Sequence, residues 1–473
     1  MKFWILVIFT GLFVCSFGCS DDGNGGNAGG DGDSDGDSDA DGDGDSDGDG
    51  DGDGDTDGKD NPYEQLADCA TFSNQDAYAG MTSCYVDSID GDDANDGLTE
   101  DTPVQSQQAV PSGCEVVRYK RGSVFNEPVA TGGYMGGGAS VFTNYGDASK
   151  PLPAFITTDS VVSAYQGGII VDGLHIEGST TSDDSSLGGG GTCVMLGGNS
   201  QLLNSEITDC GIGIMLFGDD SLVQCNTVYD LSEMVSDTPD TEVYANAVGG
   251  AEGIFVSGSN CEVAYNQFIN CKGPALWQGE GGYDGGATEV AVPEGETISG
   301  LRVHHNFSYN SCGFFEVSGF GTFADSEFYY NVSVDSSWAM LLQVNETTLD
   351  NIRWENNTFV HHEGAYTPSI AMIYQAELTP DTVSLYNNMW IFRNTDMWNA
   401  TIDDAFDAGN NIITDADPGV VNIDGLAAAD YDLVAGSEAI DAGIDVPGHG
   451  YDYLGRPVPS GSATDIGAFE YQE

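Results

Sequence analysis

Three stretches in the middle of the chain share one pattern: VQCNTVY at residues 223–229, VAYNQFI at 263–269 and VHHNFSY at 303–309. Each has an Asn at its centre, a Val three positions before it and an Ile or Tyr three positions after it. Strand-forming residues around a turn residue at a fixed offset, without helical periodicity, are typical of coils stacked along an axis. The pattern therefore predicts a solenoid of short parallel strands.

The central Asn recurs from residue 204 to residue 411. Its copies are separated by 22, 40, 40, 25, 26, 31 and 23 residues, and they are Asn204, Asn226, Asn266, Asn306, Asn331, Asn357, Asn388 and Asn411. Asn tolerates the left-handed backbone conformation, and its amide can bond its copy in the next coil. We expect each Asn to occupy a left-handed turn in an amide ladder. The two longest gaps are either coils with long loops or coils with a skipped Asn.

Motifs at both ends of this region resemble bacterial right-handed parallel β-helix proteins of the pectin-lyase-like superfamily. They are DGDDANDGLTEDTPV at 90–104 and EVVRYKRGSVF at 115–125 near the start, and LGRP at 454–457 and DIGAFEY at 465–471 near the end. The resemblance implies an all-β, single-stranded, right-handed parallel β-helix of about ten coils over residues 84–440. It also implies an N-terminal segment at 61–83 and a closing segment at 441–473. The superfamily includes lyases, hydrolases, epimerases and adhesins, so the resemblance does not fix the reaction.

The first residues are typical of an export signal. Lys2 precedes an apolar run at residues 3–17 that is too short to span a bilayer and ends in Gly18-Cys19-Ser20. We predict cleavage of residues 1–18. Cys19 resembles the lipidated Cys of bacterial lipoproteins, although Ser16 stands where that motif usually has Leu. The expected location is the cell envelope, with the lipid as the sole membrane contact at the outer membrane or cell surface; simple secretion is the alternative.

The charge balance excludes nucleic acid as the main partner. The chain has 77 Asp and Glu against 11 Lys and Arg, for a net charge of -66, whereas phosphate binding requires cations. Residues 19–60 are predicted to be a disordered Asp/Gly/Ser-rich tether, because they offer almost no apolar surface to bury. An acidic surface attracts divalent cations. Asp90, Asp92 and Asp93 are therefore candidate ligands of a structural Ca²⁺, and Ca²⁺ is the one cofactor that the sequence indicates.

Three strand-like segments predict a row of carboxyl and amide groups. GATEV at 286–290, GFFEV at 313–317 and LLQV at 341–344 align Glu289, Glu316 and Gln343, at about 4.8 Å per coil. Two carboxylates at this separation suit Ca²⁺ ligation or a glycosidase pair. Repulsion between them raises the pKa of one, which makes an acid available. In the alternative register Gln278 holds the strand position and Glu289 lies on a loop.

Three functions stay open on these residues, with an extracellular polysaccharide as the partner. In a hydrolase, Glu289 and Glu316 are acid and base or nucleophile, assisted by Asp284. In a Ca²⁺-dependent lyase these carboxylates hold the metal and Lys272 or Arg302 takes the proton. The alternative interpretation of both cations is purely structural: Arg302 stacks with Arg353, and Lys272 caps a turn. In a glycan-binding adhesin neither set acts. Residues expected to contact sugar are Trp277, Tyr283 and Gln343. We expect a monomer, and the few cations weigh against a polyuronate substrate.

The cysteines and histidines give weaker signals. Nine cysteines follow the signal region, and Cys69 with Cys84 is a plausible disulfide in an oxidising compartment. The pairs His304-His305 and His361-His362 do not indicate a metal site, because adjacent residues of a strand point to opposite faces. At most one member of each pair is then expected to face any site.

Overall fold

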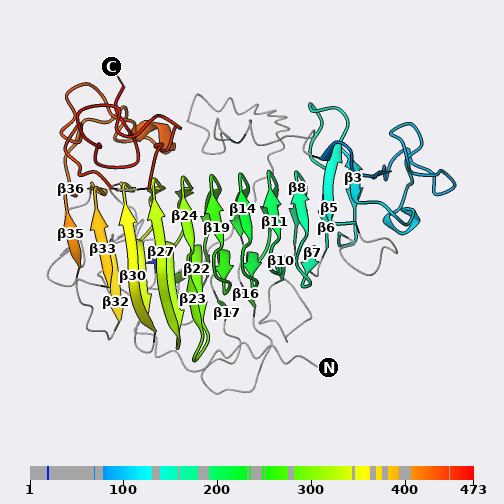
Figure 1. The fold of residues 1–473 in the computed structure, drawn as a ribbon, viewed down its shortest axis with the longest axis horizontal. Helices are drawn as coiled ribbons and strands as arrows, with labels where there is room; N and C mark the ends of the chain where they lie inside the picture. The colour runs from blue at the N-terminus through cyan, green and yellow to red at the C-terminus, as the bar shows by residue number, and fades with distance from the viewer. Residues whose placement is uncertain are drawn as a thin grey trace, which may run out of the picture.

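The chain winds as a parallel β-helix in a computed structural model (Figure 1). The structure describes residues 19–20, 69, 78–129, 139–157, 160–178, 191–231, 234–235, 248–249, 251–274, 282–343, 347–362, 369–374, 382–393, 406–446 and 448–472. Within these ranges, three long sheets of stacked strands run along the axis, so the predicted fold class is confirmed. The N-terminal coils lie at one end of Figure 1, and the C-terminal segment lies at the other.

A 13-stranded sheet contains the strand that precedes each turn with the central Asn. Its strands are β2 (Ser83–Val86), β3 (Val116–Lys120), β5 (Val141–Tyr145), β8 (Ile170–Asp172), β11 (Gln201–Leu203), β14 (Leu222–Gln224), β19 (Glu262–Ala264), β23 (Thr297–Ser299), β24 (Arg302–His304), β27 (Thr322–Tyr329), β30 (Thr348–Glu355), β33 (Val383–Tyr386) and β35 (Asp407–Gly409).

An 11-stranded sheet contains the strand that follows the same turn. Its strands are β4 (Val124–Phe125), β6 (Ala154–Ile156), β9 (His175–Glu177), β12 (Glu206–Thr208), β15 (Thr227–Leu231), β20 (Gln267–Cys271), β25 (Phe307–Tyr309), β28 (Val332–Val334), β31 (Thr358–His361), β34 (Met389–Phe392) and β36 (Ile412–Thr414).

A 10-stranded sheet completes each coil. Its parallel strands are β7 (Val162–Ala164), β10 (Thr192–Leu196), β13 (Ile212–Leu216), β18 (Ala251–Val256), β22 (Gly282–Val292), β26 (Gly313–Gly319), β29 (Trp338–Gln343) and β32 (Ser369–Tyr374). Two short strands, β1 (Cys19–Ser20) and β21 (Gly273–Pro274), pair antiparallel with β22. Outside the sheets lie the hairpin of β16 (Met234–Val235) and β17 (Val248–Gly249) and the 3₁₀ turns η2 (Gln107–Ala109) and η5 (Ala428–Tyr431).

The core is the file of apolar residues that the Asn pattern predicted. The residue three positions before each Asn from Asn226 to Asn388, such as Val223, Val263 and Val303, is fully buried, and the three Val residues are register partners on consecutive strands. Burying such side chains contributes about 1.5–3 kcal/mol each. The consecutive pairing of β14, β19 and β24 also shows that the two 40-residue gaps are single coils with long insertions.

The amide ladder is confirmed from Asn226 onward. Each Asn side chain donates to the Oδ1 of the next, as Asn306 does to Asn331 at 3.0 Å, and the file continues to Asn411. Two details of the prediction are wrong. The left-handed residue is the one before the Asn, for example Tyr330 at φ 51. Asn204 occupies that preceding position, and Ser205 is the residue whose N–H bonds Asn226 Oδ1.

The C-terminal segment packs along the outside of the 11-stranded sheet. Val334, Val360 and Ile391 face outward from this sheet and form a second apolar cluster with residues such as Tyr431 and Phe469. Hydrogen bonds join the same segment to successive turns, from His305 to Asn410. Strands β31 and β34 are therefore apolar on both faces, with Phe359 and Trp390 inside and Val360 and Ile391 outside, because both faces are covered.

The disulfides differ from the prediction that Cys69 pairs with Cys84. Cys69 pairs with Cys225, and Cys84 pairs with Cys114. A third bridge joins Cys193 to Cys210. The Cys69–Cys225 bond therefore ties the N-terminal segment to a turn of the solenoid. In the ranges that the structure describes, no helix has the length and apolar character needed to cross a bilayer.

Candidate active site

The predicted carboxylate pair lies on the 10-stranded sheet. Glu289 on β22 and Glu316 on β26 are direct Cα partners of adjacent parallel strands. Both side chains are partly buried. Glu289 is therefore on a strand, and the alternative that places it on a loop is wrong. Adjacent strands hold the two Cα atoms about 4.8 Å apart.

Gln343 does not continue this row. The register partner of Glu316 is Leu341, so Gln343 lies two positions further along β29. The partner of Glu289 on the other side is Phe255. Counting from the Asn residues gives the right partner, because Glu316 and Leu341 each lie 10 positions after their Asn. The alignment on the following Val was misleading.

A third carboxyl group, Glu252 on β18, joins the pair. Ile254 and Val256 face the core, and so does Gly253, where an added Cβ would lie 2.8 Å from Phe268 Cδ1. Two consecutive inward positions shift the usual alternation, so Glu252 faces outward like Glu289. Sequence analysis missed Glu252, although EGIFV at 252–256 matches IGIML at 212–216, its register partner.

These carboxyl groups shift one another's proton affinity. Burial, with a further contribution from the Asp284 carboxylate, raises the pKa of Glu289 to about 7, against a hydrogen bond from Ser318 Oγ at 2.9 Å that lowers it. Burial raises the pKa of Glu252 well above its usual range, and the charges of Glu289, Glu316 and Asp284 raise it further. The site therefore holds protons on carboxyl groups near neutral pH.

The two predicted lyase bases are placed differently from each other. Arg302 lies on β24 of the 13-stranded sheet, where it pairs with Glu262, so the fold does not bring it into the row of Glu289. The register partner of Arg302 on the next strand is Glu327, and the partner of Glu327 on the strand after that is Arg353. The two Arg residues are therefore separated by Glu327 and do not stack directly. Lys272 lies next to Gly273, the β21 residue that pairs with Asp284. Its ammonium group donates to Asn310 Oδ1 at 3.0 Å.

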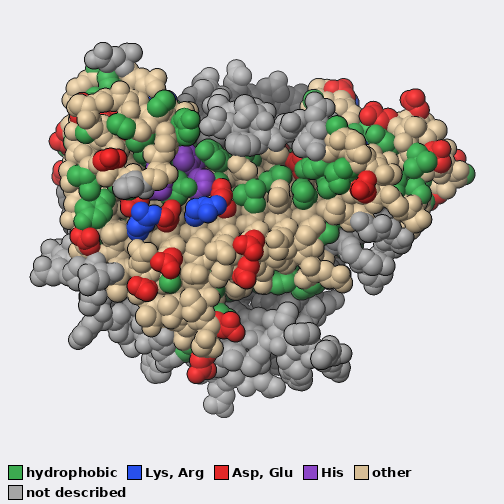
Figure 2. All heavy atoms as spheres, in the orientation of Figure 1, with side chains coloured by type: hydrophobic (Ala, Val, Ile, Leu, Met, Phe, Trp, Pro, Cys, Tyr) green, Lys and Arg blue, Asp and Glu red, His purple; other side chains and the backbone are tan. Residues whose placement is uncertain are grey.

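The expectation that at most one member of the His304-His305 pair faces a given site is wrong. His305 has φ 55, so the strand ends there and the Nδ1 atoms of the two rings lie 2.9 Å apart. Tyr329 stacks on His304 and on His449. Figure 2 shows His side chains beside basic and acidic ones on this face of the molecule. Because His305 Nε2 bonds the backbone oxygen of Asp452 at 3.0 Å, the cluster fastens the C-terminal segment to the solenoid.

The carboxylates of the acidic loop at residues 90–97 interact with groups of neighbouring residues. Asp93 accepts hydrogen bonds from the N–H groups of Gln105 and Ser106, and Asp92 accepts one from the N–H of Ala94. Asp90 lies 3.8 Å from the ammonium group of Lys120. Across the described ranges, no three His, Cys, Asp or Glu side chains are grouped closely enough to hold a metal ion. Ca²⁺ binding by this loop stays a prediction.

Some predicted residues fall outside what the structure describes. Trp277 is one of them, and the side chains of Tyr283 and Gln343 are not described, although their backbones belong to β22 and β29. The backbone of Cys19 pairs with Tyr283. The predicted sugar contacts of these residues and the lipidation of Cys19 stay predictions.

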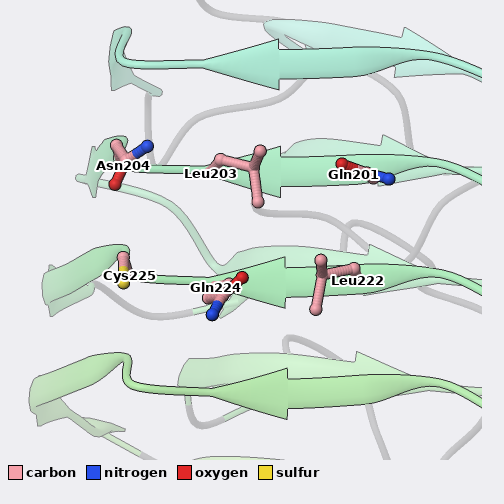
Figure 3. Close-up of a pocket in the computed structure, with 6 residues that line it drawn as sticks. All are labelled: Gln201, Leu203, Asn204, Leu222, Gln224 and Cys225. Atoms are coloured by element: carbon pink, nitrogen blue, oxygen red, sulfur yellow. The ribbon is translucent and has the colours of Figure 1, made fainter. Parts of the chain in front are cut away.

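A shallow hollow lies on the 13-stranded sheet near its middle coils (Figure 3). Its lining side chains come from β11, β14 and the turns that follow them: Gln201, Leu203, Asn204, Leu222, Gln224 and Cys225. It contains no carboxyl group and lies on another sheet from Glu289. The hollow is therefore distinct from the row of carboxyl groups.

A match to a protein-family model agrees with the fold. A family model described as a right-handed β-helix region matches residues 154–290. The solved structure of pectate lyase Pel9A is 14% identical, with a TM-score of 0.42, and the match covers 86% of this chain and 100% of that chain. GH136 lacto-N-biosidase from Eubacterium ramulus is 15% identical, with a TM-score of 0.34, over 70% of this chain and 68% of that chain. A rhamnogalacturonan lyase is 12% identical, with a TM-score of 0.34, over 70% and 87%.

None of the curated proteins compared with the chain matches it. The family model and the three parallel sheets together identify the fold as a right-handed parallel β-helix. The solved structures match too weakly to specify a reaction. The chemistry of the chain depends on the carboxyl groups on the 10-stranded sheet.

Proposed function

We propose that the chain is a glycoside hydrolase that cleaves an extracellular polysaccharide on the outer face of the 10-stranded sheet. The observation that carries the proposal is the direct pairing of Glu289 with Glu316 on adjacent strands, together with the raised pKa of Glu289 of about 7. Glycosidic bond hydrolysis requires one carboxyl group that keeps its proton and a second that acts as base or nucleophile. This pair supplies both from neighbouring coils.

Glu289 is the proposed acid. Near neutral pH a carboxyl group with this pKa is protonated in a large fraction of molecules and can donate to the glycosidic oxygen. Glu316 is the proposed nucleophile, because a strand spacing of about 4.8 Å is closer to the ~5–5.5 Å of retaining enzymes than to the ~6.5–9.5 Å that admits a water. Glu316 would form a glycosyl-enzyme bond, and Glu289, then deprotonated, would activate the water that breaks it. We expect the product to retain its anomeric configuration.

The same proposal includes the location. We propose that a lipid on Cys19 and the tether at residues 19–60 hold the solenoid at the cell surface, where a polysaccharide too large to enter the cell is accessible. The tether is almost entirely Asp, Gly and Ser, and self-repulsion extends such chains. Labelling of cells with a radioactive fatty acid, compared between the natural chain and Cys19→Ala, tests the anchor.

The experiment for the reaction uses the intact chain with a panel of plant and microbial polysaccharides. New reducing ends without the ultraviolet absorbance of unsaturated products indicate hydrolysis. Glu289→Gln and Glu316→Gln are each expected to lower kcat by about 10²–10⁴-fold, whereas the exposed Glu294→Gln should leave kcat unchanged. Unsaturated products that disappear with a chelator would establish a Ca²⁺-dependent lyase instead. Tight glycan binding without any product would establish an adhesin.

A further inference from the structure

Glu289 and Glu316 belong to a longer row of outward side chains on the 10-stranded sheet. Val162, Val194 and Ile214 point into the core, so the residue after each of them points outward. The register joins the outward residues of six adjacent strands, from β7 to β26, in the order Ser163, Met195, Met215, Phe255, Glu289 and Glu316. Glu289 therefore has a carboxyl group on one side and a phenyl ring on the other.

Two aromatic rings lie beside this row, at the ends of β7 and β13. Tyr165 and Phe217 each follow the last residue of their strand, and their ring centroids are 5.2 Å apart. Gly197 occupies the same place at the end of the intervening strand β10 and has no side chain to separate the rings. The hydroxyl group of Tyr165 donates to Met195 Sδ at 2.9 Å, so Tyr165 lies on the outer face with the first row.

The apolar side chains of this face are open to solvent. Tyr165 is 48% exposed, and Met215, Phe217 and Phe255 are partly exposed; these four residues are called the apolar strip. Apolar groups gathered on a surface often mark a binding site, because contact with water is unfavourable for them. The strip starts at Phe255, the register partner of Glu289. It reaches β7, four strand spacings or about 19 Å from β22.

Charge restricts what this strip can bind. The strands β7, β10, β13, β18, β22 and β26 contain no Lys or Arg, and their charged residues are Glu252, Asp284, Glu289 and Glu316. A uronate carboxylate would meet like charges here without a cation from these strands. The C–H face of a neutral sugar, in contrast, can pack against aromatic rings and Met side chains. A narrow strip that is continuous with the carboxyl pair suits a linear, uncharged chain.

We propose that the apolar strip binds several uncharged sugar residues of a polysaccharide that extends from the Glu289–Glu316 pair along the solenoid axis towards the N-terminal coils. The proposal rests on the proposed function, because it specifies the substrate of the same face. Phe255 contacts the sugar next to the cleaved bond, and Tyr165 with Phe217 contacts a sugar further along the chain. Long neutral chains are therefore the preferred substrates.

Binding is measured by calorimetric titration of the intact chain carrying Glu289→Gln, which prevents turnover. The probes are cellohexaose, xylohexaose, mannohexaose and hexagalacturonate. At least one neutral hexasaccharide should bind, and hexagalacturonate should bind about tenfold more weakly or not at all. Adding Tyr165→Ala or Phe255→Ala should weaken the binding of that neutral hexasaccharide about tenfold, since each removes a ring.

Two control variants test whether the rings themselves are responsible. Tyr165→Phe keeps the ring and should keep the affinity. Tyr451→Ala, the same change as Tyr165→Ala at a residue of the C-terminal segment that is 62% exposed, should also leave the affinity unchanged. Melting temperatures separate misfolding from lost binding, and Tyr165→Ala should melt close to its parent because Tyr165 is exposed.

Several results would overturn the apolar strip as a sugar site. They are equal affinity in all variants, preference for hexagalacturonate, and no binding of any probe at millimolar concentration. A dimer that Tyr165→Ala converts to a monomer in sedimentation, with unchanged sugar affinity, would assign the strip to contacts between copies of the chain instead.

The same variants distinguish this proposal from the proposed reaction. If the natural chain cleaves a polysaccharide while Tyr165→Ala and Phe255→Ala keep its KM, the strip fails and the reaction stands. If binding depends on the strip but no polysaccharide is cleaved, the reaction fails and the strip stands.

Discussion

Asn306 and Asn331 lie one coil apart and are joined twice, because Asn331 Oδ1 accepts both the side-chain amide of Asn306 at 3.0 Å and its backbone N–H at 3.1 Å. The Asn331 amide in turn donates to Val303 O at 2.8 Å and to Asn357 Oδ1 at 2.9 Å. Every polar atom of this fully buried side chain is therefore used. Because each Asn side chain in the ladder is fully hydrogen-bonded, the solenoid can bury one amide group in each of these turns.

Removing one member of the file should be costly. Asn331→Ala leaves several buried groups without partners, and we expect a loss of about 3 kcal/mol in the free energy of unfolding. Denaturant titration followed by circular dichroism measures it. The control is Asn351→Gly, at an exposed left-handed position with φ 53, which should change stability by less than about 0.5 kcal/mol. Equal effects of the two substitutions would contradict the role of the file.

The activity should depend on pH through Glu289. Its pKa of about 7 predicts that kcat/KM on the cleaved polysaccharide falls as pH rises above about 7, because the acid loses its proton. The hydrogen bond from Ser318 lowers this pKa, so Ser318→Ala should move the alkaline limb of the profile to higher pH. A pH profile of initial rates measures both effects. A limb that stays in place or moves to lower pH would exclude Glu289 as the acid.

Arg302 should be dispensable for the reaction. It lies on the 13-stranded sheet in an ion pair with Glu262, and its side chain is 47% exposed. Arg302→Gln is expected to change kcat by less than tenfold and stability by about 1 kcal/mol or less. A proton-abstracting base would instead cost about 10²–10⁴-fold. Steady-state rates on the polysaccharide that the natural chain cleaves decide between the two.

His361 should make the fold sensitive to acid. Burial lowers its pKa from 6.5 to about 4, so its contribution to stability is present above pH 6.5 and is lost as pH falls from 6.5 towards 4. His361→Phe, which extends the apolar file of Phe392, should therefore narrow the difference in melting temperature between pH 8 and pH 5.

His175 is the matched control with the opposite sign. Hydrogen bonds and charges of Glu206 and Glu177 raise its pKa, so its contribution is present below pH 6.5 and is lost as pH rises through its folded pKa. His175→Phe should lower the melting temperature at pH 5 more than at pH 8. If the two variants responded alike to pH, burial of neutral His361 would not be the cause of the acid sensitivity.

The fold could be predicted because every coil repeats the same local choice. Val, Asn and a second strand residue recur at fixed offsets, and each copy is consistent with its neighbours along the axis. The pairing of Glu289 with Glu316 could be predicted for the same reason, since similar short motifs surround both. Both predictions rest on a motif that is contained in one coil and recurs in the next.

The misplaced residues depend on what joins or interrupts the coils. Gln343 does not pair with Glu316, because the register follows the preceding Asn and not the following Val. Glu252 does not stand out in the sequence, because inserted residues separate it from Asn226. The disulfide of Cys69 depends on where the N-terminal segment contacts the solenoid. That position does not follow from the sequence repeat. His304 and His305 do not point to opposite faces, because His305 has a left-handed backbone and belongs to the turn rather than to the strand.

The C-terminal segment has a consequence for how the molecule opens. In a solenoid each coil contacts only its neighbours, so the terminal coils would be the first to fray. Here the C-terminal segment is hydrogen-bonded to four turns, at His305, Asn356, Asn387 and Asn410, and its His449 stacks on Tyr329 beside a fifth turn that lies between the first two. These turns must lose their contacts with the C-terminal segment before they can separate from one another. The last third of the chain therefore resists unravelling as a single block, and amide hydrogen exchange there should proceed in concert rather than coil by coil.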